Sequence, residues 1–89
     1  MNKNFSPNTN PSSSRSVLIT GAAGGIGRAT VHHFDNAGWQ VIGVDRAPFG
    51  EPFPERGLYI QSDISIGENL ETIFNQAKSF CGYLNAVVN

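Results

Sequence analysis

The sequence predicts an α/β protein built on a doubly wound parallel sheet, with four strands in the order 3-2-1-4. An apolar run over residues 16–20 stops at a turn in which four of seven residues are glycine, and a helical pattern follows. Strand-like and helix-like segments then alternate along the chain, which is typical of a parallel sheet. Right-handed crossovers place the second and third strands on one side of the first strand and the fourth on the other.

The glycine turn, residues 21–27, has the form of a phosphate-binding entry between a strand and a helix. Gly21 lets the chain turn sharply off the strand, and Gly24 or Gly25 lets the backbone approach a pyrophosphate. Gly27 lets the helix pack closely on the strand. Free N–H groups and the positive end of the helix dipole then face the phosphates. We therefore expect a partial dinucleotide-binding domain over residues 16–89, preceded by a disordered leader of Asn, Ser and Pro over residues 1–15.

The helix after the turn is predicted to bury Ile26, Ala29, Thr30, Phe34 and Ala37, and Gly38 is predicted to end it. His32 and His33 are expected on its polar side. Neighbouring residues on a helix point about 100° apart, so this pair does not converge on a metal.

Residues 39–44 form the next predicted strand, and Asp45 stands at its end, 18 residues after Gly27. This is close to the roughly 20 residues expected for an acidic residue that accepts hydrogen bonds from a ribose. A carboxylate there repels a 2′-phosphate, so we expect NAD as the cofactor and NADP as the less favoured one. Arg46 leaves NADP open, because an arginine beside the site can pair with that phosphate.

Prolines at high density make residues 47–57 an irregular connection instead of a crossover helix, and residues 58–61 form a third predicted strand. Ser65 and Glu68 fit a capping box at the start of a helix. Its predicted apolar stripe comprises Leu70, Ile73, Phe74, Ala77, Phe80 and Cys81. Gly82 ends this helix, and residues 84–88 form the fourth predicted strand.

Charge and cysteine content exclude several classes of function. With 6 basic and 7 acidic residues in 89, the chain lacks the basic excess of a nucleic-acid or anionic-membrane binder. A single cysteine allows no internal disulfide, and no apolar run is long enough to span a membrane. We therefore expect a cytoplasmic protein with no nucleic-acid or membrane partner, and the sequence shows no spacing of metal ligands.

The stretch from Thr20 to Gly27 resembles the Thr-Gly-x-x-x-Gly-x-Gly motif of the short-chain dehydrogenase/reductase family. The resemblance covers residues 16–89 and implies the N-terminal half of a Rossmann-like sheet, which is then incomplete. It also implies the roles of the candidate cofactor-binding residues. Gly21, Gly25 and Gly27 form the turn, and Ile26 presents its amide to the pyrophosphate. Asp45 holds the adenosine ribose, Asp63 and the Ile64 backbone contact the adenine, and Asn89 steadies the fourth strand beside the cofactor.

The family's chemistry uses a Tyr-x-x-x-Lys pair, and this sequence has none. Position four beyond Tyr59 is Asp63, and position four beyond Tyr83 is Val87. An unassisted tyrosine titrates near pH 10 and is a poor base at neutral pH. We therefore expect no catalytic residue in the chain. The resemblance implies the NAD(P)-binding portion of an oxidoreductase whose complete form transfers hydride between nicotinamide and an alcohol or carbonyl, the chain alone being inactive.

Two alternatives remain open. Gly21, Gly24 and Gly27 also satisfy Thr-Gly-x-x-Gly-x-x-Gly, the motif of extended relatives that act as nucleotide-sugar epimerases and dehydratases. The other alternative is a non-enzymatic nucleotide-binding or interaction module. The resemblance implies that the complete protein is a homo-oligomer, and the chain alone can self-associate through the exposed edge of its fourth strand.

Overall fold

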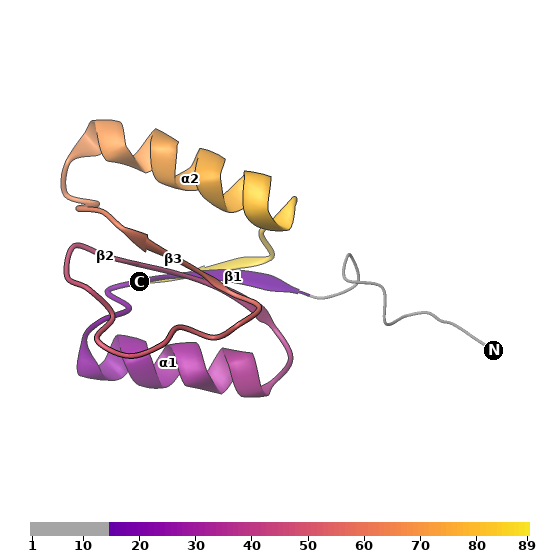
Figure 1. Cartoon of the computed structure of the whole chain (residues 1–89). Coiled ribbons are helices and arrows are strands. Elements are labelled where there is room, and N and C mark those ends of the chain that lie inside the picture. Colours follow the sequence, from indigo (N-terminus) through magenta and orange to yellow (C-terminus); the bar gives the residue numbers. More distant parts are fainter. Residues whose placement is uncertain (1–14) are drawn as a thin grey trace.

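Four parallel strands and two helices make up the computed structural model, which describes residues 15–89 (Figure 1). Its elements are β1 (Ser16–Thr20), α1 (Gly25–Asn36), β2 (Gln40–Asp45), β3 (Leu58–Gln61), α2 (Gly67–Cys81) and β4 (Ala86–Val88). The strands form one sheet in the order β3-β2-β1-β4, which confirms the predicted fold class and strand order. The predicted leader lies outside the described residues, apart from Arg15.

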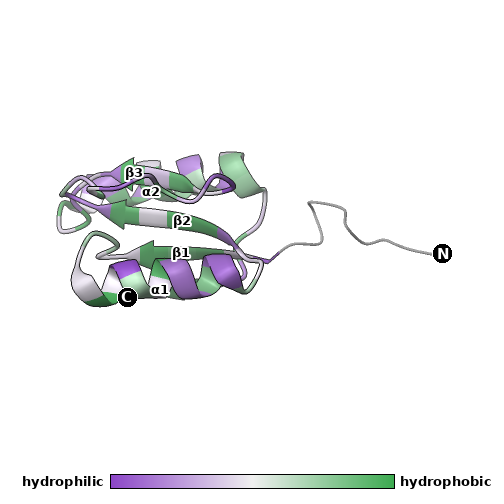
Figure 2. Cartoon of the chain, turned by 60° about the horizontal axis from the view of Figure 1, so that its bottom comes forward, coloured by the Kyte–Doolittle hydropathy of each residue, from purple (hydrophilic) through white to green (hydrophobic). Residues whose placement is uncertain are grey.

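The sheet is covered by α1 on one face and by α2 on the other (Figure 1). Successive residues of β1 point to opposite faces, so Val17 and Ile19 join the core under α1, whereas Leu18 joins the core under α2. β1 and β2 are therefore almost continuously hydrophobic, while α1 mixes hydrophilic and hydrophobic residues (Figure 2). This composition is typical of parallel strands buried on both faces.

The segment between β2 and β3 is irregular, as its prolines predict, and it packs on the same face of the sheet as α1. Phe49 is buried there, and its ring centroid lies 4.9 Å from that of Phe53 and 5.4 Å from that of Tyr59. These aromatic side chains fill the space that a crossover helix would otherwise occupy.

The predicted buried face of α1 is only partly correct. Thr30 and Phe34 are partly buried, but Ala29 and Ala37 are exposed, and Ile26 is 87% exposed. The side of the helix that meets the sheet instead carries Gly27, Val31 and Phe34. A Cβ atom at Gly27 would lie 1.9 Å from the carbonyl oxygen of Gly21, so this close approach sets the rotation of the helix. Gly38, with a φ of +89°, lies just past the helix end as predicted.

The predicted capping box at the start of α2 is wrong. Ile66 occupies the N-cap, and no side chain accepts a hydrogen bond there. The Ser65 hydroxyl and amide both donate to Asp63 Oδ1, at 2.7 Å and 2.9 Å, so Ser65 is engaged in a turn before the helix. Along α2 the fully buried side chains are Ile73 and Ala77.

The fourth strand begins later than predicted, at Ala86. Before it, the Asn85 amide donates to the Ser16 carbonyl across 2.9 Å, and the Ser16 amide donates to Asn85 Oδ1 across 2.8 Å. A side-chain oxygen thus replaces a backbone carbonyl at the point where the strand ladder would start. Among the described residues, no helix has the length and apolar character needed to cross a membrane.

Candidate functional site

Two hollows at the carboxyl ends of the strands meet at Gly21. One, of about 210 Å³, lies at the ends of β2 and β3 and is lined by Gly21, Val44, Asp45, Arg46, Ser62, Asp63 and Ile64. The other, of about 260 Å³, lies at the ends of β1 and β4 and is lined by Ile19, Thr20, Gly21, Ile26, Gly27, Thr30, Val88 and Asn89. Apart from Gly24 and Gly25, all the candidate cofactor-binding residues line one of the two. Strand order reverses between β1 and β4, and ligands of open α/β sheets bind at such switch points.

The glycine turn is closed by its own backbone. Gly21 adopts a φ of +66°, a left-handed conformation that side chains disfavour, and its carbonyl accepts the Gly24 amide at 3.1 Å. No atom lies within 4 Å of a Cβ built at Gly25, so the surface there is open to a ligand. The N-cap Gly24 supplies no capping side chain, and the first turn of α1 holds no acidic residue. The positive end of this helix is therefore available to an anion.

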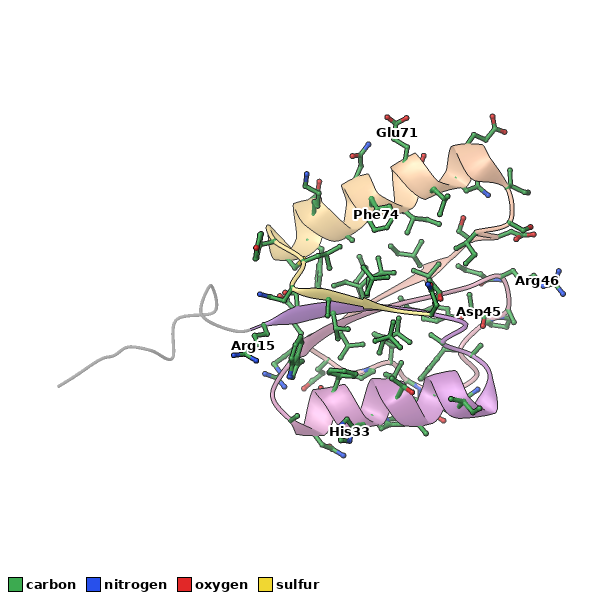
Figure 3. The ribbon with its side chains drawn as sticks, turned by 180° about the vertical axis from the view of Figure 1, so that it is seen from behind. Arg15, His33, Asp45, Arg46, Glu71 and Phe74 are labelled. Carbon is green, nitrogen blue, oxygen red and sulfur yellow. The ribbon has the colours of Figure 1, made fainter. Side chains whose placement is uncertain are left out.

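Asp45 lies at the end of β2 between the glycine turn and the segment that leads to β3. Its Oδ2 accepts the Ala23 amide at 3.0 Å, and its Oδ1 accepts the Ala47 amide at 2.9 Å. A carboxylate has about four acceptor positions, so the half-buried Asp45 retains capacity for two further donors such as ribose hydroxyls. Arg46 is exposed and extends outward from the end of the sheet (Figure 3).

Asp63 and Ile64 form the far wall of the smaller hollow. Hydrogen bonds from the Ser65 hydroxyl and then the Ser65 amide hold the pKa of the Asp63 carboxyl below its ordinary value, and the positive charge of Arg46 acts in the same direction. Asp63 is thus ionised at neutral pH, with Oδ1 occupied by its own turn. Ile64 is 37% exposed beside it, which provides an apolar surface at this wall.

Asn89 lies at the carboxyl ends of β1 and β4. The Thr20 hydroxyl lies 3.1 Å from Asn89 Oδ1 and 3.3 Å from the Val88 carbonyl oxygen. The single hydroxyl hydrogen is shared between these acceptors, and this contact joins the end of β1 to the end of β4 at the strand switch point.

Tyr59 is not among the lining residues of either hollow at the strand ends. Its hydroxyl donates to the Ala47 carbonyl. Burial, followed by the negative charge of Asp45, raises the pKa of the Tyr59 phenol above its ordinary value. The phenol is therefore held neutral and engaged with the backbone, which makes it a poor proton acceptor.

Arg28 is the residue that sequence reasoning missed. Its Nη2 donates to the Ala23 carbonyl at 3.1 Å, and its Nη1 lies 2.9 Å from Glu51 Oε1. Its guanidinium also lies over the Phe49 ring, 4.6 Å from the centroid. The sequence feature that could have indicated Arg28 is its position: it is a basic residue directly after Gly27, the last glycine of the glycine turn, and lies in the first turn of the predicted helix.

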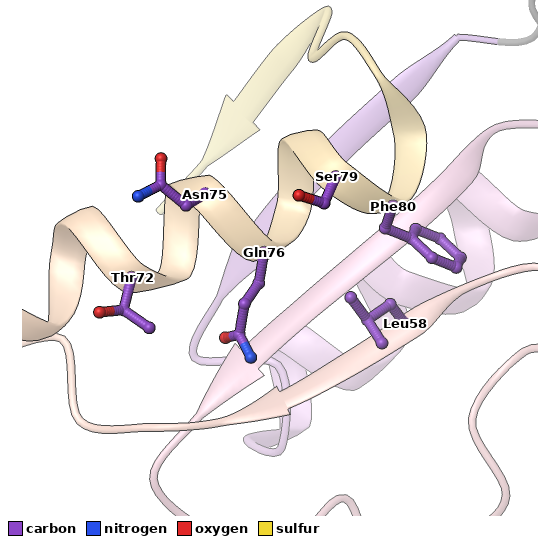
Figure 4. A pocket seen from close by; sticks show the side chains of 6 residues that line it. All are labelled: Leu58, Thr72, Asn75, Gln76, Ser79 and Phe80. Atoms are coloured by element: carbon purple, nitrogen blue, oxygen red, sulfur yellow. The ribbon is translucent and has the colours of Figure 1, made fainter.

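The described part of the chain has two larger hollows, each of about 510 Å³. One adjoins the glycine turn along α1 and is lined by Gly25, Ile26, Ala29, Thr30 and His33. The other lies between α2 and β3 and is lined by Leu58, Thr72, Asn75, Gln76, Ser79 and Phe80 (Figure 4). It offers amides and hydroxyls but no charged group. The volume of a hollow therefore does not single out the candidate site, which is chosen because a carboxylate lies beside exposed backbone donors. Within residues 15–89, no three His, Cys, Asp or Glu side chains gather closely enough to hold a metal ion.

Comparison with known proteins agrees with this geometry. L-fucose dehydrogenase of Rattus norvegicus is 33% identical over 81 residues, which are 86% of this chain and 30% of that protein. A short chain dehydrogenase of Leptospira borgpetersenii, solved with bound NAD+, matches with a TM-score of 0.76 and 26% identity, over 85% of this chain and 30% of that one. UDP-glucose 4-epimerase of Thermotoga maritima, solved with UDP-glucose, matches with a TM-score of 0.59 and 31% identity, over 71% of this chain and 21% of that one.

The chain thus spans about 30% of the length of the dehydrogenases it matches. The family model described as short chain dehydrogenase matches residues 15–89, which are all the residues that the structure describes. With its Rossmann-like sheet and its glycine turn at the strand switch point, the chain belongs to the short-chain dehydrogenase family.

Proposed function

We propose that this chain forms the part of an NAD-dependent oxidoreductase that binds the adenosine diphosphate portion of the cofactor. One observation carries the proposal: the Asp45 carboxylate is held by two backbone amides at the hollow that also contains Gly21. A ribose beside Asp45 would place its diphosphate over the first amides of α1, where the positive end of the helix favours negative charge.

The choice of NAD over NADP rests on charge. A 2′-phosphate on the ribose would approach the Asp45 carboxylate, and the repulsion between like charges would weaken its binding. Arg46 is the one cation among the lining residues of this hollow, and its side chain is exposed. The related dehydrogenase with bound NAD+ supports the same choice.

For the whole protein we propose hydride transfer between the nicotinamide ring and an alcohol or carbonyl substrate. The cofactor supplies the hydride chemistry, and this chain supplies binding and orientation. The chain itself has no Tyr-x-x-x-Lys pair, so we propose that it is inactive without further residues. A cytoplasmic location is proposed from its single cysteine.

A second candidate function is an interaction module, and the open edge of β4 favours it. Among the strands that the structure describes, β4 pairs with β1 alone, and Val87 in its centre is 49% exposed. Unpaired strand edges with apolar residues readily pair with another chain. Self-association through β4, or homo-oligomer formation by the whole protein, would cover this surface.

Calorimetric titration with NAD tests the proposed cofactor site. We expect dissociation constants in the millimolar range or tighter for the unmodified chain, and loss of binding in Asp45→Ala and in Gly25→Val. A Cβ added at position 25 meets no atom within 4 Å, so we expect Gly25→Val to block the ligand without a clash inside the protein. Asp35→Ala is the matched control, because Asp35 belongs to α1 and pairs with Arg56 at 3.6 Å. Binding that is unchanged in both Asp45→Ala and Gly25→Val contradicts the proposal.

A further inference from the structure

We propose that Arg28 is a positioning residue of the adenosine site, which acts by fixing Ala23 against Asp45. The inference rests on the proposed function, because it assigns a residue that shapes the same site without touching the cofactor. Arg28 lies outside both hollows at the strand ends, so its effect must pass through the backbone of the glycine turn.

Ala23 is held at both of its backbone polar groups. Its amide donates to Asp45 Oδ2 at 3.0 Å, and its carbonyl accepts Arg28 Nη2 at 3.1 Å. Rotation of either peptide group would break one of these bonds. The position of the Asp45 carboxylate is therefore coupled to the position of the Arg28 guanidinium through a single residue.

The guanidinium is itself fixed from two further directions. Glu51 Oε1 lies 2.9 Å from Nη1, and the Phe49 ring centroid lies 4.6 Å from the guanidinium carbon. The hydrogen bond from Arg28 is the largest cause that holds the pKa of Glu51 below its ordinary value, with His32 acting in the same direction. Glu51 is thus ionised at neutral pH and available to Arg28.

These contacts connect the irregular β2–β3 segment to the glycine turn. Glu51 Oε2 also lies 3.0 Å from His32 Nε2, so the segment is attached to α1 at two successive turns. Phe49 anchors the same segment in the core. The buried Phe49 ring and the exposed Glu51 carboxylate together hold the Arg28 guanidinium in one place beside Ala23.

Arginine suits this position, and lysine does not replace it. One planar guanidinium donates to a carboxylate and to a carbonyl while its face stacks on an aromatic ring. A lysine ammonium is a compact charge without a planar face, so it loses the stacking and the fixed spacing of the two guanidinium nitrogens. Arg28→Lys is therefore expected to behave more like a deletion of the side chain than like a conservative change.

The test combines NAD titration with amide resonances in nuclear magnetic resonance spectra of the full chain. In Arg28→Met we expect NAD affinity to fall about fivefold to tenfold, and in Glu51→Gln about twofold to threefold, because an exposed ion pair contributes less. The Ala23 amide resonance should shift upfield and exchange faster in both variants, as its hydrogen bond to Asp45 weakens. The Ala47 amide, which donates to the other Asp45 oxygen, should move less.

Arg56→Met is the matched control, because Arg56 is an exposed arginine that pairs with Asp35 at the far end of α1. It should leave the NAD affinity and the Ala23 resonance unchanged. An unchanged Ala23 resonance in both Arg28→Met and Glu51→Gln overturns the inference. The spectra are recorded without ligand, so they test the positioning of Ala23 even if NAD fails to bind, which would contradict the proposed function instead.

Discussion

The Ala23 amide donates to the Asp45 carboxylate across 3.0 Å, although 22 positions separate the two residues in the sequence. This bond joins the end of β2 to the glycine turn that follows β1. The two parts of the proposed cofactor site, one for the ribose and one for the diphosphate, therefore have a fixed spacing before any ligand arrives. Such preorganisation reduces the entropic cost of binding.

Replacement of Asp45 by asparagine should separate the effect of charge from that of shape. Asp45→Asn keeps one oxygen for the Ala23 or Ala47 amide but turns its amide nitrogen toward the other donor. We expect NAD affinity to fall about tenfold and the preference for NAD over NADP to narrow, because the charge that repels a 2′-phosphate is gone. Paired titrations with NAD and NADP measure both effects. A preference unchanged from that of the unmodified chain would show that Asp45 does not select the cofactor.

Two glycines of the turn should respond differently to alanine. In Gly27→Ala the new Cβ would lie 1.9 Å from the Gly21 carbonyl oxygen, so α1 must move away from the turn, and we expect the free energy of unfolding to drop by about 3 kcal/mol. Gly25→Ala meets no atom within 4 Å and lies in the first turn of a helix, so the stability should be unchanged or rise by about 0.5 kcal/mol. Urea unfolding of both variants measures the difference. Equal stabilities would contradict the packing role of Gly27.

The glycine turn and the order of the strands could be predicted from the sequence because each depends on local signals. A short stretch of chain is enough to specify each of three features: a strand with an apolar β-branched run, a turn with a positive-φ glycine, and a right-handed crossover. The position of Asp45 followed from the length of one strand–helix–strand unit. The sequence analysis assigned Gly21 and Asp45 to one cofactor site, and in the structure both residues line the same hollow.

The parts that sequence reasoning missed depend on contacts between distant residues. The rotation of α1 follows from the approach of Gly27 to Gly21, and the apolar pattern of the helix does not contain that information. Ser65 met every local requirement of a cap, yet Asp63 competes for its hydroxyl. The role of Arg28 depends on Glu51, 23 positions away in an irregular segment that has no periodicity to interpret.

The stability contributed by Glu51 should depend on pH in acid. Its pKa is lowered in the folded state, chiefly by the hydrogen bond from Arg28, so its contribution is present above the ordinary value of 4.5. The contribution is lost as the pH falls from 4.5 through the lower folded value. Urea midpoints of the unmodified chain and of Glu51→Gln should therefore differ at pH 7 and converge in acid. The pKa of Asp63 is also lowered, but Asp63 is present in both proteins, so its contribution to the pH dependence cancels when the two urea midpoints are subtracted.

The Tyr59 phenol should ionise at higher pH than a free tyrosine. Tyr59 and Tyr83 are the two tyrosines of the chain, so a Tyr83→Phe variant isolates the Tyr59 titration by ultraviolet absorbance. Burial and the nearby Asp45 charge favour the neutral phenol, which places the transition above pH 10. The stability that Tyr59 contributes is present below its unfolded pKa and is lost as the pH rises through the folded pKa. In Asp45→Asn the transition should move to lower pH, and an unmoved transition would exclude Asp45 as a cause.

A charge at the centre of β4 should prevent self-association through this strand. Val87 pairs with Leu18 in register, so its side chain points toward the α2 face, where it remains 49% exposed. Lysine at this position repels a second copy of the same edge and adds a desolvation cost to any pairing. We expect the unmodified chain to show a sedimentation coefficient that rises with concentration, and Val87→Lys to remain at the monomer value. Thr72→Lys, on the exposed surface of α2 that faces β3, is the control and should associate like the unmodified chain. Association that persists in Val87→Lys and is lost in Thr72→Lys would place the contact on the opposite edge of the sheet.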